Sequence, residues 1–142
     1  MDAIERNKIA MKRFQVMINT NDKDLAEELI APTAAFQSLI SPTPLYGGAG
    51  YLSVVEFMRR SFSNVRWELA DMSAEADKVA VHWICSGVHD GPFMGMPATG
   101  KEFSFSCMNF YYFNAEGQIT RDVAAQGMLG LLEALGMTLQ QS

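Results

Sequence analysis

Asp122 is the residue of this 142-residue chain whose surroundings best suit acid–base chemistry. It lies within a predicted strand, Gln118–Gln126, where Asp is otherwise disfavoured. Side chains alternate between the two faces of a strand, so the small residues Thr120 and Ala124 share the face of Asp122 and leave room for a ligand. An apolar pocket would raise the pKa of this carboxyl group and suit it to move a proton beside a carbonyl. The alternative is a carboxylate that faces solvent or pairs with an arginine.

His89 and several aromatic and amide side chains could complete a binding site. The imidazole of His89, at the end of a predicted strand, could donate to a substrate oxygen or relay a proton, or it could be a structural group bonded to the loop backbone. Asn109 interrupts an aromatic strand and needs a partner if it is buried, either a ligand or a backbone group. Further candidates for the pocket are Gln37, Tyr51, Trp83, Phe93, Met96, Phe105 and Tyr111.

Other chemistries find little support in the sequence. We see no Gly-x-Ser-x-Gly nucleophile motif and no phosphate-binding loop. The histidines and cysteines are not at metal-ligand spacing, so we expect no metal and no cofactor. Alternation places His82 on the face opposite Trp83. A hairpin symmetric about Met96 would set Cys85 and Cys107 opposite each other, as two free, buried thiols.

Length, charge and hydropathy limit the partners. A chain of 142 residues is most simply one domain, residues 1–142. The net charge of −5 argues against nucleic-acid binding, which needs a basic surface. No apolar run approaches the roughly 18 residues that span a bilayer, so we expect no membrane segment. The N-terminus has no apolar signal-peptide core, and this together with free thiols predicts a cytoplasmic protein.

Two β-rich runs, Val79–Val88 and Lys101–Phe113, organise the rest of the chain. Their Val, Ile, Trp, Phe and Tyr residues fit a pleated, half-buried surface. The intervening Asp90–Gly100 carries three glycines and two prolines, which favour turns. The pattern predicts two long antiparallel strands joined by a structured loop.

The remaining elements follow from periodicity and from turn residues. We expect helices over Asp2–Asn19, Lys23–Ile30, Tyr51–Ser63 and Met128–Leu135, strands over Ala34–Ile40, Asn64–Ala74 and Gln118–Gln126, and a loop over Ser41–Gly50. Helices followed by consecutive strands predict an α+β fold. A curved antiparallel sheet with the N-terminal helices would form a cone-shaped barrel with an internal pocket.

The loop also carries a family resemblance. Its residues read Gly-x-His-x-Gly over Gly87–Gly91 and Gly-x-Pro-Ala-Thr-Gly over Gly95–Gly100. This pattern resembles that of the SnoaL-like polyketide cyclase family, and the likeness extends from about Asn7 to Gly136. The resemblance implies a nuclear-transport-factor-2-like fold that is often dimeric or tetrameric through its sheet. It implies a metal-free intramolecular aldol cyclisation with a carboxylate as acid and base. Other members of the wider superfamily isomerise steroids or only bind ligands.

Three positions depart from the family pattern. Many relatives have a His-Trp pair on the last strand, where this chain has Asp122 and Val123. Relatives often carry an acid just before the final helix, where this chain has Gly127, and a histidine on the first strand, where it has Gln37. The substrate therefore differs from that of these relatives, or the activity has been lost.

These observations leave three hypotheses. The first is an enzyme, a polyketide or ester cyclase or a related isomerase, in which Asp122 moves protons and His89 and Asn109 position or polarise a small hydrophobic carbonyl compound. The second is a non-catalytic small-molecule-binding protein of the same fold. The third is an interaction domain. All three permit a homodimer or tetramer through an outer sheet face that carries Phe110 and Tyr112.

Overall fold

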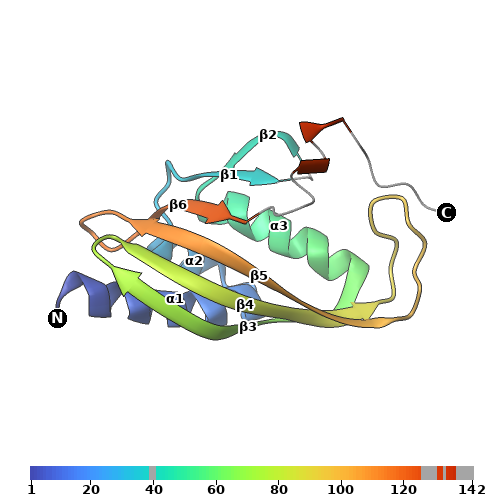
Figure 1. Cartoon of the computed structure of the whole chain (residues 1–142), viewed down its shortest axis with the longest axis horizontal. Coiled ribbons are helices and arrows are strands. Elements are labelled where there is room, and N and C mark those ends of the chain that lie inside the picture. The colour runs from blue at the N-terminus through green and yellow to red at the C-terminus, as the bar shows by residue number, and fades with distance from the viewer. Residues whose placement is uncertain (39–40, 126–130, 133, 137–142) are drawn as a thin grey trace.

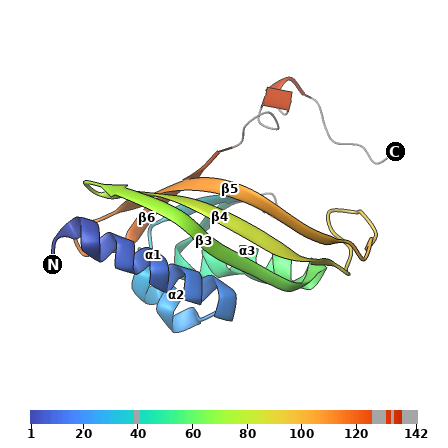
Figure 2. The same ribbon diagram turned by 60° about the horizontal axis from the view of Figure 1, so that its bottom comes forward.

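A computed structural model describes residues 1–142 except 39–40, 126–130, 133 and 137–142. The helices are α1 (Ala3–Thr20), α2 (Lys23–Leu29) and α3 (Gly47–Ser61); the strands are β1 (Ala35–Ser38), β2 (Ser41–Tyr46), β3 (Phe62–Glu75), β4 (Lys78–His89), β5 (Glu102–Phe113) and β6 (Ile119–Ala124). The longer strands form an antiparallel sheet in the order β3-β4-β5-β6, and β1 pairs with β2 (Figure 1). The three helices lie on one face of the larger sheet (Figure 2).

The first two helices agree with the sequence prediction to within two residues, because their caps are encoded locally. Asp2 accepts a hydrogen bond from the Glu5 amide at 2.8 Å, and Asn21 ends α1 in the left-handed conformation with φ of 54°. The buried side of α1 includes Met11, Phe14 and Met17, none of which is more than 1% exposed. The helix therefore supplies one half of the core beneath the sheet.

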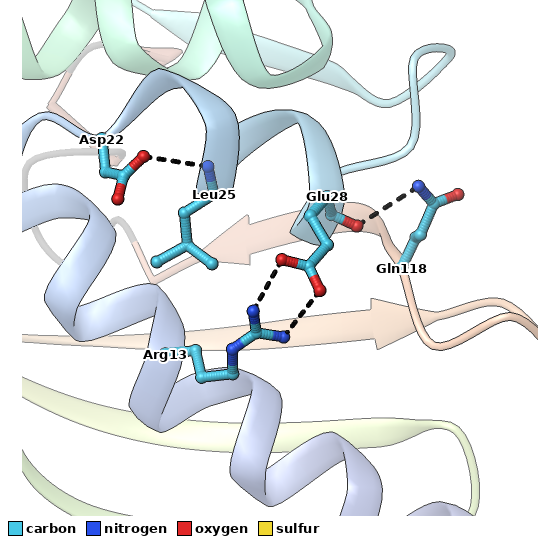
Figure 3. Close-up of polar contacts among 5 residues, drawn as sticks. All are labelled: Arg13, Asp22, Leu25, Glu28 and Gln118. Atoms are coloured by element: carbon cyan, nitrogen blue, oxygen red, sulfur yellow. Dashed lines mark hydrogen bonds and ion pairs between the residues drawn. The ribbon is translucent and has the colours of Figure 1, made fainter.

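Polar contacts fix α2 between α1 and the start of β6 (Figure 3). The Arg13 guanidinium forms two parallel hydrogen bonds to the Glu28 carboxylate, at 3.0 and 2.6 Å. The Asp22 side chain caps α2 by accepting from the Leu25 backbone amide. The Gln118 side-chain amide donates to the Glu28 backbone carbonyl. The ion pair is exposed to solvent, which screens it, so it orients the helices more than it stabilises them.

The outer edge of β3 is covered by side chains of α1. Asn19 forms two hydrogen bonds with the backbone of Trp67, accepting from its amide at 2.9 Å and donating to its carbonyl at 2.8 Å. Gln15 accepts from the Leu69 amide at 2.6 Å. An uncovered strand edge offers unpaired amides and carbonyls to other chains. These two helix residues occupy several of those groups and fix α1 against the sheet.

The hairpin of β4 and β5 forms as predicted, but its register differs by two residues. Cys107 lies opposite Trp83, and Cys85 lies opposite Phe105, so the expectation that the cysteines face each other is wrong. The centre of symmetry is Gly95, one residue before Met96, because loop geometry and the packing of the strands set the pairing and composition does not. Both cysteines are free. Their thiol pKa values are raised by burial, which makes them less reactive.

The loop predicted over Ser41–Gly50 is wrong, because this segment forms β2 and the first turn of α3. Its prolines are tolerated since, in the part of the chain that the structure describes, β2 pairs with β1 alone and lies at an edge. A Cβ atom on Gly48 would lie 2.7 Å from the Ala26 backbone. This glycine therefore allows α3 to approach α2 closely, and it is not a sign of a loop.

The predicted α+β fold is confirmed, with a curved sheet that does not close into a barrel in the described part of the chain. His82 lies on the face opposite the buried Trp83, as predicted. None of the described helices is long and apolar enough to cross a membrane. Much of the helix predicted over Met128–Leu135 lies outside the described residues, as does the end of the strand predicted over Ala34–Ile40.

Candidate active site

Asp122 lies on the helix-covered face of β6, directly opposite Tyr111 of β5. The register shifts between Tyr112 and Phe113, so Ile119 opposes Phe113, and the Thr120 hydroxyl donates to the Tyr112 carbonyl at 3.3 Å. Simple alternation predicts that Thr120 lies on the same face of β6 as Asp122. The bulge at Thr120 puts Ile119 next to Asp122 on that face instead. The space near Asp122 therefore does not come from Thr120.

A cavity of about 620 Å³ adjoins Asp122. It lies between β6, β1, β3, α3 and the last turn of α1. Its apolar walls include Ile18, Phe36, Val54, Val55, Met58 and Trp67, and its polar side chains include Gln37, Tyr51 and Asp122. Ala124 also lines it, as predicted. An apolar chamber with a few convergent polar groups is typical of a small-molecule site.

The Asp122 side chain is half-buried, and among the described residues its carboxyl group has one hydrogen-bond donor. The Asn109 side-chain amide donates to its Oδ1 at 2.7 Å. Burial raises the pKa of Asp122 from 3.8 to about 6, and the Asn109 hydrogen bond acts in the opposite direction. The predicted need of Asn109 for a partner is thus met by Asp122. A carboxyl with this pKa exchanges protons readily at neutral pH.

Aromatic hydroxyl groups lie behind and beside Asp122. The Trp83 indole Nε1 donates to the Tyr111 hydroxyl at 2.8 Å, and both side chains are almost fully buried. The Tyr51 ring, which lines the cavity, contacts Phe14 and Phe36 with centroid separations of 5.0 and 5.1 Å. Burial, followed by the negative charge of Asp122, raises the pKa of the Tyr51 hydroxyl well above its usual value. Tyr51 therefore keeps its proton and can donate a hydrogen bond.

The structure does not bring His89 to this cavity. Asp122 is level with Tyr111, which pairs with Val79, and His89 is ten residues further along β4. Ten residues of strand span about 33 Å. Figure 1 shows the β4–β5 loop projecting beyond the end of the sheet that is distant from β6. His89 and Asp122 therefore cannot act on the same small molecule.

His89 instead closes the loop that carries the family pattern. Its Nδ1 and the Thr99 hydroxyl lie 2.9 Å apart, and the same hydroxyl accepts from the Lys101 amide at 3.3 Å. The backbones of His89 and Lys101 also bond, at 2.9 Å. His89 is only 8% exposed, and its Nε2 is buried without a partner among the described residues. The structural reading of this histidine is the one that the geometry supports.

The same loop is fastened to the junction of α3 and β3. The Asp90 carboxylate accepts from the Ser63 amide at 2.9 Å, and the Gly91 amide donates to the Ser61 carbonyl at 2.9 Å. The Ser61 hydroxyl donates to the Pro92 carbonyl at 2.8 Å. A Cβ atom on Gly91 would lie 2.7 Å from a backbone oxygen of the same junction. The start of the loop is therefore held against this junction, and the close approach requires a glycine at position 91.

The other predicted residues divide between the two regions. Gln37 and Tyr51 line the cavity, whereas Trp83 and Tyr111 lie in the core behind it. Three aromatic or methionine side chains lie near the loop and do not line the cavity: Phe93 packs against Phe57 and Phe62, Met96 is 41% exposed, and Phe105 is 49% exposed.

Sequence reasoning missed several walls of the cavity, most of them apolar. Trp67 could have been found, since it shares the inner face of β3 with the buried Val65. Phe36 and Met58 could not, because their contribution depends on how β1 and α3 pack against β6. Among the described residues, no three His, Cys, Asp or Glu side chains are grouped as metal ligands.

The curved sheet, the covering helices and the carboxylate beside a cavity define a protein of the nuclear-transport-factor-2-like class. The family model described as "SnoaL-like polyketide cyclase" matches residues 8–135, so the chain belongs to the SnoaL-like polyketide cyclase family. No protein among the curated ones matches the chain.

Solved structures agree on the fold. TsrD from Streptomyces laurentii is similar with a TM-score of 0.75 and 22% identity, over 97% of this chain and 99% of that one. IdmH from Streptomyces antibioticus, a candidate polyketide cyclase, has a TM-score of 0.72 and 25% identity, over 92% and 99%. AclR from Streptomyces galilaeus, a candidate hydroxylase, has a TM-score of 0.69 and 22% identity, over 98% and 90%. Similar folds thus carry different reaction names.

Proposed function

We propose that this protein is a cyclase or isomerase that moves protons on a hydrophobic carbonyl compound, with Asp122 as the acid–base group. The observation that carries the proposal is the Asp122 carboxyl beside an apolar cavity of about 620 Å³, with a pKa raised to about 6. Membership of the family and similarity to candidate polyketide cyclases support a role of this type. The proposed reaction needs no cofactor.

The chemistry begins with proton transfer from carbon. The ionised Asp122 takes a proton from the carbon beside a carbonyl, and the electron pair of the broken C–H bond forms the enolate. In a cyclase, the enolate carbon attacks a second carbonyl of the same molecule, and the new alkoxide takes the proton back from Asp122. In an isomerase, the proton returns at another carbon. Both reactions are net isomerisations with no change of oxidation state.

The surrounding residues would have distinct roles. Asn109 occupies one carboxylate oxygen of Asp122 and acts as a positioning residue. Gln37 and Tyr51 offer polar contacts to the ligand, and the apolar walls select a hydrophobic compound. His89 does not polarise the carbonyl in this proposal, because it lies near the other end of the sheet.

Exchange of the α-protons of 2-tetralone in heavy water, followed by NMR, tests the proposal without a known substrate. 2-Tetralone is a small hydrophobic ketone with acidic C–H bonds. We expect wild-type protein to accelerate deuterium incorporation above the buffer rate, and Asp122→Asn to lower this acceleration at least 100-fold. Equal acceleration by the variant would remove Asp122 from the mechanism.

The alternative function is non-catalytic binding of a small molecule. It is favoured by the departure of Asp122–Val123 and Gln37 from the family pattern. This function predicts that 2-tetralone binds in the cavity, as shown by chemical-shift changes at Tyr51 and Trp67, while its α-protons exchange only at the buffer rate. That result would support the binding protein and contradict the enzyme.

We also propose that the chain forms a homodimer through the outer face of the sheet. On this face Met108 is 59% and Phe110 is 45% exposed, beside an apolar hollow of about 530 Å³. Tyr112, the other residue expected there, is covered by the Arg121 guanidinium at 5.2 Å. Light scattering should give a dimer mass that Phe110→Asp reduces to a monomer. Phe105→Asp, an equally exposed position on the other face, should leave the dimer intact.

A further inference from the structure

A row of polar aromatic side chains, Trp83, Tyr111 and Tyr51, leads from the core to the cavity. The Trp83 Nε1 donates to the Tyr111 hydroxyl at 2.8 Å. An indole N–H can donate but cannot accept, so the Tyr111 oxygen is the acceptor in this bond. The Tyr111 proton must therefore point away from Trp83. Because the two side chains are 3% and 1% exposed, water does not compete for these groups.

The next hydroxyl in the row is that of Tyr51. The Phe14 ring packs against both tyrosines, with centroid separations of 5.0 Å to Tyr51 and 5.3 Å to Tyr111. No hydrogen bond of ordinary length joins the two hydroxyls among the described residues, but Tyr111 acts on Tyr51 in the sense of a donor, lowering its pKa against the larger effect of burial. If Tyr111 donates in this direction, the Tyr51 oxygen accepts and its own proton is free.

Tyr51 lines the cavity and Tyr111 does not, so the free end of the row opens toward a bound ligand. Among the described residues no hydrogen bond joins the Tyr51 hydroxyl to Asp122, whose Oδ1 is already taken by Asn109. Asp122 therefore offers an oxygen to accept a proton, and Tyr51 offers a hydrogen to donate. A carbonyl compound needs both groups at once when it forms an enolate.

We propose that the Tyr51 hydroxyl is the hydrogen-bond donor to the carbonyl oxygen of the substrate, and that Trp83 and Tyr111 are positioning residues that set the direction of its proton. The inference rests on the proposed function and deepens it, because it defines the substrate as a ketone or ester whose carbonyl oxygen reaches Tyr51 while its α-carbon faces Asp122.

The step balances without a further reactant. Asp122 takes the α-proton, the C–H electron pair becomes the carbon–carbon double bond of the enolate, and the carbonyl π electrons move to oxygen. Negative charge thus leaves the carboxylate and appears on the oxygen that Tyr51 faces. A donor fixed before the reaction stabilises this charge at no cost of reorganisation. The high pKa of Tyr51 keeps the hydroxyl protonated, so the bond is donated from a neutral group.

The test uses 2-tetralone labelled with ¹³C at its carbonyl and bound to the full chain. Infrared spectroscopy should show the carbonyl stretch of the bound probe at lower frequency than in hexane. Tyr51→Phe removes one oxygen and keeps the ring that packs on Phe14 and Phe36, and it should restore the hexane-like frequency. The same variant should lower α-proton exchange about 100-fold. Tyr111→Phe and Trp83→Phe should broaden the band and lower exchange less.

Tyr112→Phe is the matched control, because it removes a hydroxyl from the same strand on the opposite face, and it should change neither readout. Asp122→Asn separates this inference from the proposed function, since it should abolish exchange yet keep the shifted carbonyl band. A wild-type band at the hexane frequency, or a shifted band that survives Tyr51→Phe, would overturn the donor role while leaving Asp122 untouched. Failure of 2-tetralone to bind the wild type would overturn both proposals.

Discussion

The two ends of the four-stranded sheet differ in what their residues do. At one end, Gly87–Lys101 carries the family pattern, and its His89 and Thr99 bond to each other. At the other end, Asp122 departs from that pattern. It lies beside a cavity, and the pKa of its carboxyl group is raised. A recognisable pattern can thus record how a hairpin is closed, while the chemistry depends on residues outside it.

The difference has a physical origin. Closing the loop requires polar groups that satisfy one another, so Asp90 and Thr99 accept from nearby backbone amides. The cavity requires the opposite, because a group that moves protons must be partly unsatisfied and partly desolvated. Asp122 has one hydrogen-bond donor among the described side chains, and its half-buried position disfavours its charge.

The largest predicted effect tests whether proton transfer is confined to the Asp122 end. Only the ionised carboxylate can accept a proton, so exchange of 2-tetralone should follow a titration near pH 6. The protein-dependent rate should be about tenfold lower at pH 5 than at pH 8. His89→Gln is the necessary control, because it removes the imidazole of the loop and leaves Asp122 in place. If the exchange rate of that variant no longer changed near pH 6, the proton would be taken by His89 in the loop and not by Asp122.

A second prediction uses the opposite pKa shifts of two aspartates. Burial raises the folded-state pKa of Asp122 from 3.8 to about 6, so its stabilising contribution is present below pH 4 and is lost as the pH rises through 6. Asp122→Asn should therefore raise the free energy of unfolding by up to about 3 kcal/mol at pH 8, and by little at pH 4. Urea unfolding at both pH values measures this difference.

Asp90 is the matched control, since hydrogen bonds from Ser63 lower its pKa. Its contribution is present above its ordinary pKa and is lost in acid, so Asp90→Asn should destabilise the protein at pH 8. Opposite signs for the two variants would confirm that one carboxyl serves the fold and the other does not. Destabilisation by both would mean that Asp122 is a structural group as well.

A third prediction concerns the glycines of the family pattern. Gly91→Ala would place a Cβ atom 2.7 Å from the Arg60 carbonyl oxygen, which is backbone and cannot easily move. We expect a loss of about 1–3 kcal/mol in the free energy of unfolding. Gly95→Ala meets nothing within 4 Å but has φ of +82°, so it should cost about 1 kcal/mol. Equal costs would show that the junction with α3 does not hold the loop.

Much of this fold could be predicted from the sequence, because its signals are local. The caps at Asp2 and Asp22 and the alternation in β4 need only neighbouring residues. The site could be predicted in part: Asp122 was identified because a carboxylate in a β-rich segment is unusual. The bulge before it was not, since nothing in Thr120 itself indicates an extra residue in the strand.

The remaining errors arise from contacts between segments distant in the chain. In the sequence Gly48 indicates a turn, but in the structure it allows α2 to pack closely against α3. In the sequence His89 indicates catalysis, but in the structure it bonds to Thr99. Whether residues share a site depends on strand register, which composition does not determine. The grouping of His89 with Asp122 failed for this reason, because ten residues of β4 separate their levels.

The smallest predicted effect is the sharpest test of the loop end. Thr99→Val keeps the shape of the side chain and removes the hydroxyl that meets both His89 and the Lys101 amide. Because Thr99 is exposed, water can replace part of what is lost, and we expect a cost of about 0.5–1 kcal/mol. Amide hydrogen exchange at Gly100 and Lys101 should become faster, while α-proton exchange of 2-tetralone should stay within twofold of the wild-type rate. A larger fall in that rate, in a protein that is still folded, would couple the loop to the cavity and end the separation of the two regions.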